Sequence, residues 1–293
     1  MDADIKIDLK SEDVKDVTIT LINKFCDGIS WLANRPTPHR IAVEEYIADI
    51  QNNTSLDAKT KAVLIYNAKK DIKKWSNTSS ICERAADKLL PTANPDSVDD
   101  DWRNIFTDHA ENISNEDMQE IWSFILAQEC NEPGSIPKAL LNTLFSMGKR
   151  EAEYFEKLAS FCVYIVDADG KKGDAIPLII NTHINDYYND HGLGLDALYT
   201  LETLGLVNMD ISPLGGIATS VDNTSVIEYF DETINVSDVY TKDGQLSVGA
   251  VSLSFIGEAL MKIMVPKKIE GFFESVAVPY FKNPNKHIDD MFE

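Results

Sequence analysis

The stretch that decides the fold runs from Ile113 to Ser135 and reads ISNEDMQEIWSFILAQECNEPGS. Ser114 carries a hydroxyl that can cap the first N–H groups of a helix. Apolar residues then recur every three or four positions, which is typical of a helix with one apolar face. The members of this stripe are Met118, Ile121, Trp122, Ile125 and Leu126. Pro133 and Gly134 end the pattern, so the stretch predicts two consecutive helices joined by a Pro-Gly turn.

Glu129 breaks this pattern, because it lies seven positions after Trp122 and therefore continues the apolar face. A carboxylate that faces a core needs partners, since burying it unpaired costs several kcal/mol. One interpretation is a general acid or base with a raised pKa. The other is a structural carboxylate that binds the free backbone N–H groups of residues 135–138 or pairs with Arg103. We favour the structural role, because no second carboxylate, His or Cys lies at a spacing that completes a site.

The same region resembles a known pattern. Residues 122–129, WSFILAQE, and residues 133–135, PGS, are similar to the signature W-x-x-I-L-A-x-E…P-G-S of a family of uncharacterised bacterial proteins. Trp102 with the preceding aspartate lies where that family has a D-W pair, and the resemblance is clearest over residues 95–165. The residues that we take as its structural signature are Trp102, Trp122, Glu129, Pro133, Gly134 and Ser135.

Two segments depart from the family pattern. Residues 136–138 read Ile-Pro-Lys in place of F-S-x-R, and residues 148–150 read Gly-Lys-Arg in place of a more polar helix start. The resemblance implies no established activity. The family is distantly similar to alpha-type abortive-infection proteins of phage defence, which implies a role in bacterial antiviral defence.

The charge of the chain is strongly acidic and unevenly distributed. The 293 residues carry a net charge of −21. Residues 151–293 hold 9 Lys and Arg against 23 Asp and Glu, a net charge of −14, and contain no Arg. Such a charge repels nucleic acid and anionic membranes, so we expect neither as a partner.

The cysteine pattern and the N-terminus predict a cytoplasmic protein. The four cysteines are Cys26, Cys82, Cys130 and Cys162, and no two form a CxxC pair. Each lies among apolar residues, so we expect buried free thiols, which suit a reducing compartment. The N-terminus lacks the basic and then apolar segments of a signal peptide, and no apolar run approaches the ~20 residues that span a bilayer.

The first part of the chain has the pattern of an α-helical bundle. Apolar periodicity predicts helices over residues 11–33, 37–52 and 57–90, and three or four shorter helices over residues 102–164. We therefore predict a bundle domain over residues 1–165. One face of the long helix is rich in lysine, which we interpret as a solvated face and not as a nucleic-acid stripe. Its lysines are Lys59, Lys61, Lys69, Lys70, Lys73 and Lys74.

Two clusters of polar residues could suggest metal binding. Asp99, Asp100 and Asp101 precede a predicted helix, and we interpret them as charges that suit its positive N-terminus. His183, Asp186 and Asp190 share one face if their segment is helical, which is the geometry that a zinc site would need. The alternative is the polar face of an ordinary helix, and we predict no cofactor.

The second part of the chain mixes helices and strands. A helix over residues 193–204 runs into a strand, two β-rich segments follow at residues 225–236 and 245–255, and a last helix covers residues 267–281. Residues 253–260, LSFIGEAL, resemble the L-T-x-x-G-x-x-L segment that closes winged-helix domains. We predict a mainly α protein with an α+β, winged-helix-like module over residues 166–282 and a polar tail over residues 283–293.

The chain lacks the common catalytic motifs, including the P-loop, G-x-G-x-x-G, G-x-S-x-G and H-E-x-x-H. We therefore predict a non-enzymatic interaction protein, an adaptor or a sensor. One alternative is a winged-helix transcription regulator. However, the predicted helix 193–204 has no Lys or Arg and carries Asp196 and Glu202. A further alternative is a hydrolase or nuclease that uses Glu129 with the acids 99–101.

A protein partner or a homo-oligomer is expected from the excess of apolar residues on two helices. The long helix and the last helix carry aromatic side chains of the kind that is enriched at interface cores. The interface candidates are Trp75, Phe272, Phe273 and Tyr280. An ordinary intramolecular core is the alternative.

Overall fold

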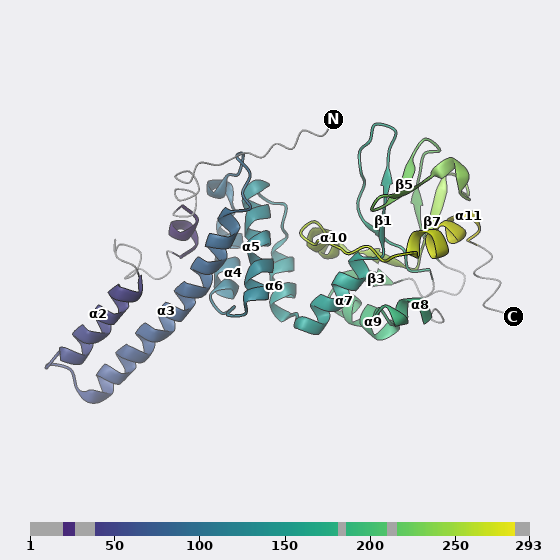
Figure 1. Cartoon of the computed structure of the whole chain (residues 1–293). Helices are drawn as coiled ribbons and strands as arrows, with labels where there is room; N and C mark the ends of the chain where they lie inside the picture. Colours follow the sequence, from purple (N-terminus) through teal and green to yellow (C-terminus); the bar gives the residue numbers. More distant parts are fainter. Residues whose placement is uncertain (1–19, 27–38, 181–185, 210–215, 285–293) are drawn as a thin grey trace. The chain divides into compact units, whose positions relative to one another are not determined.

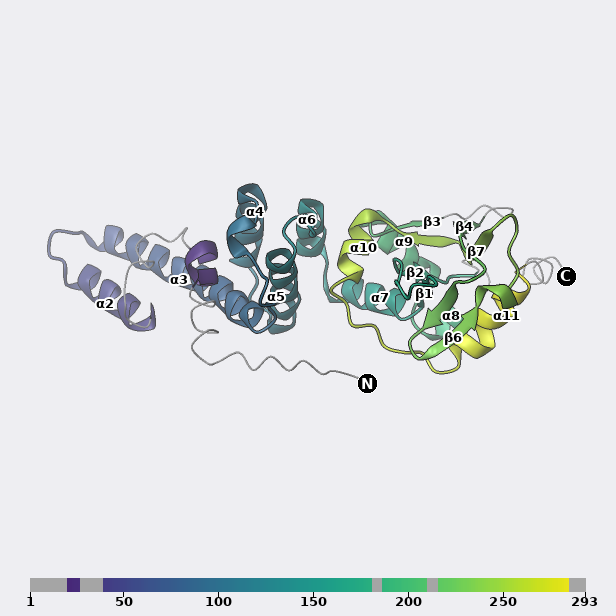
Figure 2. The ribbon, with the colours of Figure 1, turned by 90° about the horizontal axis from the view of Figure 1, so that it is seen from above.

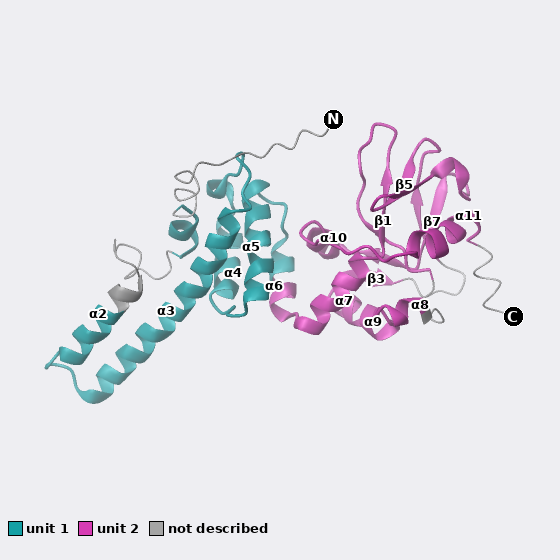
Figure 3. Ribbon diagram, viewed as in Figure 1, with its two compact units in different colours: residues 1–141 teal, residues 142–293 magenta. Residues whose placement is uncertain are grey.

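The computed structural model describes residues 20–26, 39–180, 186–209 and 216–284. The chain forms two compact units, residues 1–141 and 142–293 (Figure 3). The described residues are mainly helical, with small antiparallel sheets in the second unit (Figure 1). The boundary falls within α6 (Lys138–Ser146), so the segment 142–165, which the sequence analysis placed in the bundle, belongs to the second unit.

The first unit is built of helices. They are a helix over residues 20–26, α2 (His39–Asn52), α3 (Ala58–Ala86), the short η1 (Pro95–Ser97), α4 (Asp100–Ala110), α5 (Glu116–Asn131) and the start of α6. The long helix that the sequence predicts is one continuous helix of 29 residues, which Asp57 caps by accepting the N–H of Thr60 at 2.9 Å. α2 and the first half of α3 lie side by side as a hairpin (Figures 1 and 2).

The core of the first unit lies where the second half of α3 packs against α4 and α5. Trp102 and Phe106 of α4 stack with ring centroids 5.1 Å apart, and Trp122 of α5 lies 5.3 Å from Phe106. All three rings are buried. The predicted N-cap of α5 is wrong by one residue, because the side chain of Asn115, not that of Ser114, accepts the N–H of Met118.

The second unit alternates helices and strands. Its helices are α7 (Lys149–Ala159), α8 (Asp186–Asp190), α9 (Leu195–Thr203), the short η2 (Val236–Asp238), α10 (Phe255–Met261), the π-helical η3 (Phe273–Ala277) and α11 (Val278–Lys282). Its strands are β1 (Cys162–Val166), β2 (Ile176–Pro177), β3 (Val207–Met209), β4 (Ile217–Ser220), β5 (Val226–Tyr229), β6 (Glu232–Asn235), β7 (Gln245–Gly249) and β8 (Val251–Leu253).

The strands pair in three small antiparallel groups, β2-β1-β5-β6, β3-β8 and β4-β7. Each predicted β-rich segment is therefore two strands. Phe230, at φ 51°, turns the chain between β5 and β6, and Gly249, at φ 98°, lies at the end of β7. The predicted last helix is shorter than expected, because Gly271 adopts a φ of +76°, a left-handed conformation through which a helix does not continue. Before it, the backbone N–H of Ile269 donates to the hydroxyl of Tyr229.

No helix among residues 20–26, 39–180, 186–209 and 216–284 combines the length and apolar character needed to cross a membrane. The predicted tail is described only at residues 283 and 284, and residues 285–293 lie outside the described part of the chain.

Candidate functional site

Glu129 closes the turn between α5 and α6. Its side chain is 1 % exposed, and its two oxygens accept the backbone N–H groups of Gly134 at 2.7 Å and of Ile136 at 2.9 Å. Burial raises the pKa of Glu129, while these two hydrogen bonds act in the opposite direction. Of these two partners, Ile136 lies within the predicted range 135–138, and Gly134 precedes that range by one residue. Arg103 instead forms an ion pair with Asp100, at 3.0 Å.

The other signature residues support the same turn. The indole Nε1 of Trp102 donates to the carbonyl of Ile136 at 2.9 Å, so the peptide groups on both sides of Ile136 are fixed. Gly134 adopts a φ of +87°, a backbone conformation that residues other than glycine rarely adopt. The backbone N–H of Ser135 donates to the carbonyl of Glu132 at 3.0 Å. The signature of Trp102, Glu129, Gly134 and Ser135 is therefore a device that shapes a helix connection.

The three aspartates lie at the N-terminus of α4, as the sequence predicts, with Asp99 as the N-cap and Asp100 and Asp101 in the first turn. Asp99 caps α4 by accepting the N–H of Trp102 at 2.9 Å, and it pairs with Lys138 at 2.7 Å. The Lys138 ammonium and this N–H group lower the pKa of Asp99. Glu129 has both oxygens bound to backbone. The side chains of Asp100 and Asp101 are exposed.

Only part of the candidate zinc site lies among the described residues. His183 lies outside the described residues, as does the side chain of Asp186. Asp190 is exposed at the end of α8, and Nδ1 of the following His191 lies 2.7 Å from the carbonyl oxygen of Tyr187. Within the described part of the chain, no three His, Cys, Asp or Glu side chains converge as a metal site would require.

Three of the four interface candidates are core residues, which corrects that prediction. Phe272, Phe273 and Tyr280 are at most 5 % exposed in the second unit, so a partner cannot reach them in this fold. Phe272 contacts the ring of Tyr229 at 5.2 Å, and Phe273 stacks on the same ring at 5.8 Å. Periodicity alone could not separate an internal core from an interface. The fourth candidate, Trp75, is half-buried in the first unit.

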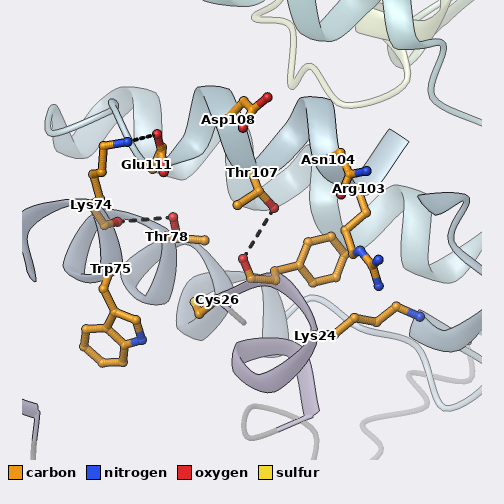
Figure 4. A pocket seen from close by; sticks show the side chains of 11 residues that line it. Lys24, Cys26, Lys74, Trp75, Thr78, Arg103, Asn104, Thr107, Asp108 and Glu111 are labelled. Atoms are coloured by element: carbon orange, nitrogen blue, oxygen red, sulfur yellow. Dashed lines mark hydrogen bonds and ion pairs between the residues drawn. The ribbon is translucent and has the colours of Figure 1, made fainter. Parts of the chain in front are cut away.

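Trp75 lines a pocket of about 590 Å³ in the first unit (Figure 4). Three helices form its walls. The lining residues are Lys24, Phe25 and Cys26 from the helix over residues 20–26, Lys74, Trp75 and Thr78 from α3, and Arg103, Asn104, Thr107, Asp108 and Glu111 from α4 and its C-cap. The hydroxyl of Thr107 donates to the carbonyl of Phe25 at 3.4 Å, and this hydrogen bond links α4 to the helix over residues 20–26.

Three cations and two acids line this pocket. Lys74 and Glu111 form an ion pair with each other. Lys24 pairs with Asp96 at 3.4 Å, and Arg103 pairs with Asp100 at 3.0 Å. Neither Asp96 nor Asp100 lines the pocket.

The pocket also has a buried thiol on its wall. Cys26 contacts Cys82 of α3, and this contact together with burial raises the pKa of Cys82. Burial raises the pKa of Cys130 to about 12. All four cysteines are free and buried, as the sequence predicts. A thiol whose pKa is raised, as in Cys82 and Cys130, is a poor nucleophile.

Comparison with known families identifies the chain. Residues 66–277 match the family described as "Protein of unknown function (DUF2806)". The chain belongs to this family. No curated protein and no solved structure matches it.

The DUF2806 region begins inside α3 and includes α4 and α5, but it does not include the helix over residues 20–26. One wall of the pocket therefore comes from outside the family match. The sequence analysis did not find this pocket, because Lys24, Lys74 and Arg103 are far apart in the chain and no local motif joins them. The one available signal was Trp75, a large aromatic side chain on the apolar stripe of α3.

Proposed function

We propose that this DUF2806 protein is a non-enzymatic interaction protein of the adaptor type, and that it associates with a second copy of itself through a helical hairpin. The hairpin consists of α2 and residues 58–75 of α3. The observation that carries the proposal is the contrast between the two halves of α3. Ala68 is the one buried residue up to position 76, whereas seven are buried between Asn77 and Ala86.

Large apolar side chains are exposed on this hairpin. Val63 is 52 % and Tyr66 is 68 % exposed. A helix gains most of its stability in a protein from packing an apolar face, and two helices alone bury little of it. Pairing with a second hairpin would cover these side chains in a four-helix arrangement.

The charges of the hairpin favour self-pairing. Glu45 and Asp49 on α2 are exposed, and so are Lys69, Lys70 and Lys73 on α3. In a two-fold interface the same patch serves both copies, so the acidic α2 of one copy can face the lysines on α3 of the other. Such complementarity directs association and fixes register.

Light scattering tests this proposal over a protein concentration range of about a hundredfold. We expect a mass that rises from monomer to dimer, and we expect Tyr66→Asp to give the monomer mass throughout. Tyr199→Asp, at an exposed tyrosine of α9, is the matched control and should leave the association unchanged. A parent chain that stays monomeric over the whole range would overturn the proposal.

For the second unit we propose a winged-helix-like module that docks protein and does not read DNA. The order α7, β1, β2, α8, α9, β3 supports this, as does the antiparallel pairing of β3 with β8. In such a module α9 would be the recognition helix, yet it has no Lys or Arg and carries Asp196 and Glu202. A transcription regulator, the second candidate, would need cations there.

The resemblance to alpha-type abortive-infection proteins supports a place for this association in bacterial antiviral defence. Plating phage on cells that produce the parent chain or Tyr66→Asp tests it. We expect fewer plaques with the parent chain than with the variant. Equal plaque numbers for cells with the parent chain and cells without it would remove the defence role and leave the association to be judged by light scattering.

A further inference from the structure

We propose that the pocket of the first unit binds a small organic phosphate with a planar ring, the chemistry of a nucleoside monophosphate. The proposal goes beyond the self-association above and does not depend on it. At about 590 Å³ the pocket has the size of small-molecule sites, and its lining places different chemistry at its different sides.

The phosphate would lie at the side formed by Lys24 and Arg103 (Figure 4). The side chain of Lys24 is only 13 % exposed, and its carboxylate partner, Asp96, is 87 % exposed at 3.4 Å. An ammonium that has lost most of its water is poorly compensated by one hydrated carboxylate, so a second anion inside the pocket would stabilise it. Arg103 adds a planar group with five donors, a geometry that suits phosphate oxygens.

The ring would lie against Trp75, which Figure 4 shows on the opposite side of the pocket from Lys24 and Arg103. An indole offers a flat surface on which a nucleobase stacks. α4 also contributes Asn104, Thr107 and Asp108 to the lining, which supply amide, hydroxyl and carboxylate groups. These groups suit the hydroxyls of a sugar, since amide and carboxylate oxygens accept hydrogen bonds from them.

The acidic net charge of the chain does not prevent anion binding here. At physiological ionic strength, exposed charges beyond about 8 Å are largely screened, so the groups that line the pocket dominate. Lys74 and Glu111 neutralise each other, which leaves Lys24 and Arg103 against Asp108. Asp96 and Asp100 are mostly exposed, so water can replace the cations as their partners when a ligand binds.

Isothermal titration of the full chain with four probes tests the proposal. The probes are adenosine monophosphate, ribose 5-phosphate, adenosine and inorganic phosphate. We expect adenosine monophosphate to bind at least about tenfold more tightly than each of the others, because only it engages both sides. No binding of adenosine monophosphate up to about 10 mM would overturn the proposal. Equal binding of ribose 5-phosphate would overturn the assignment of the ring to Trp75.

Variants separate the two sides of the pocket. Lys24→Gln and Arg103→Gln should each weaken the binding of adenosine monophosphate at least about tenfold and leave the affinity for adenosine unchanged. Trp75→Leu should reduce the affinity for adenosine monophosphate to that for ribose 5-phosphate. Lys149→Gln and Arg150→Gln remove the same charges from α7 and should change neither affinity. Equal weakening by these control variants would mean that net charge, and not the pocket, binds the phosphate.

Discussion

The carboxylate of Glu129 accepts the backbone N–H of Ile136 at 2.9 Å, across the turn that joins α5 to α6. The other oxygen of the same carboxylate accepts the backbone N–H of Gly134 at 2.7 Å, inside that turn. A buried acid therefore performs the task that a capping residue performs at an exposed helix end. Glu129, Gly134 and Ile136 thus shape the connection between α5 and α6.

Glu129→Ala should lower the free energy of unfolding by about 2–4 kcal/mol, because it leaves two N–H groups of the turn without their acceptor. Glu129→Gln should cost less, since one amide oxygen can still accept one of them. Urea denaturation measures both. Glu132→Ala, at an exposed glutamate in the same turn, is the control and should change stability little. A Glu129→Ala chain of unchanged stability would contradict the structural role.

The raised pKa of Glu129 gives a prediction about pH. An acid whose pKa is higher in the folded than in the unfolded chain retains its proton up to a higher pH when the chain is folded. Its contribution to stability is therefore fully present below the unfolded value near 4.5 and decreases as pH rises through the folded pKa. The stability of the parent chain relative to Glu129→Gln should fall as pH increases from 4.5 toward neutrality. Denaturant titrations at several pH values test this, and a difference that increases with pH would mean that the two N–H groups outweigh burial.

Gly257 gives a prediction for the second unit. A Cβ at this position in α10 would lie 2.0 Å from the backbone oxygen of Leu206, so α10 and the residue before β3 can approach only because glycine has no side chain. Gly257→Ala should destabilise the unit by about 1–3 kcal/mol by forcing the two backbones apart. Gly216→Ala, where the nearest atom would be 3.5 Å away, is the control. Equal melting temperatures for the two variants would contradict this close approach.

The helical part of the fold could be predicted from the sequence because its signals are local. Apolar periodicity and capping residues lie within a few positions of each other, and the long helix predicted over residues 57–90 is α3, Ala58–Ala86. The partners of Glu129 were also within reach, since they follow it by five and seven positions.

Features that depend on distant residues could not be predicted. Before the last helix, the backbone N–H of Ile269 donates to the hydroxyl of Tyr229, forty positions earlier, a contact that no local pattern indicates. The aromatic residues Phe272 and Phe273 have the pattern of a helix face whether they meet a partner or their own core. The pocket was not visible, because Lys24 and Arg103 meet only after three helices have packed.

We expect no DNA binding by the second unit, although a winged-helix-like module would otherwise favour it. A winged helix neutralises phosphates with Lys and Arg on its second helix and its wing. α9 carries Asp196 and Glu202 and no cation. The segment from β5 to β8 offers Lys242 against Glu228, Asp231, Glu232, Asp238 and Asp243. Residues 151–293 have a net charge of −14, so approach to a duplex is repulsive, and low salt strengthens the repulsion.

Fluorescence anisotropy of a labelled random-sequence duplex with the full chain, at about 50 mM salt, measures this directly. We expect no binding in the micromolar range, and we expect that raising the salt does not weaken whatever signal remains, because no counterions are released. Replacing Asp196 and Glu202 together by lysine is a positive control, since it reverses the charge of α9 and should raise affinity. The prediction is wrong if the parent chain binds in the low micromolar range with an affinity that falls as salt rises. A cationic surface other than α9 would then contact the phosphates, and a transcription regulator would become the favoured function in place of an adaptor.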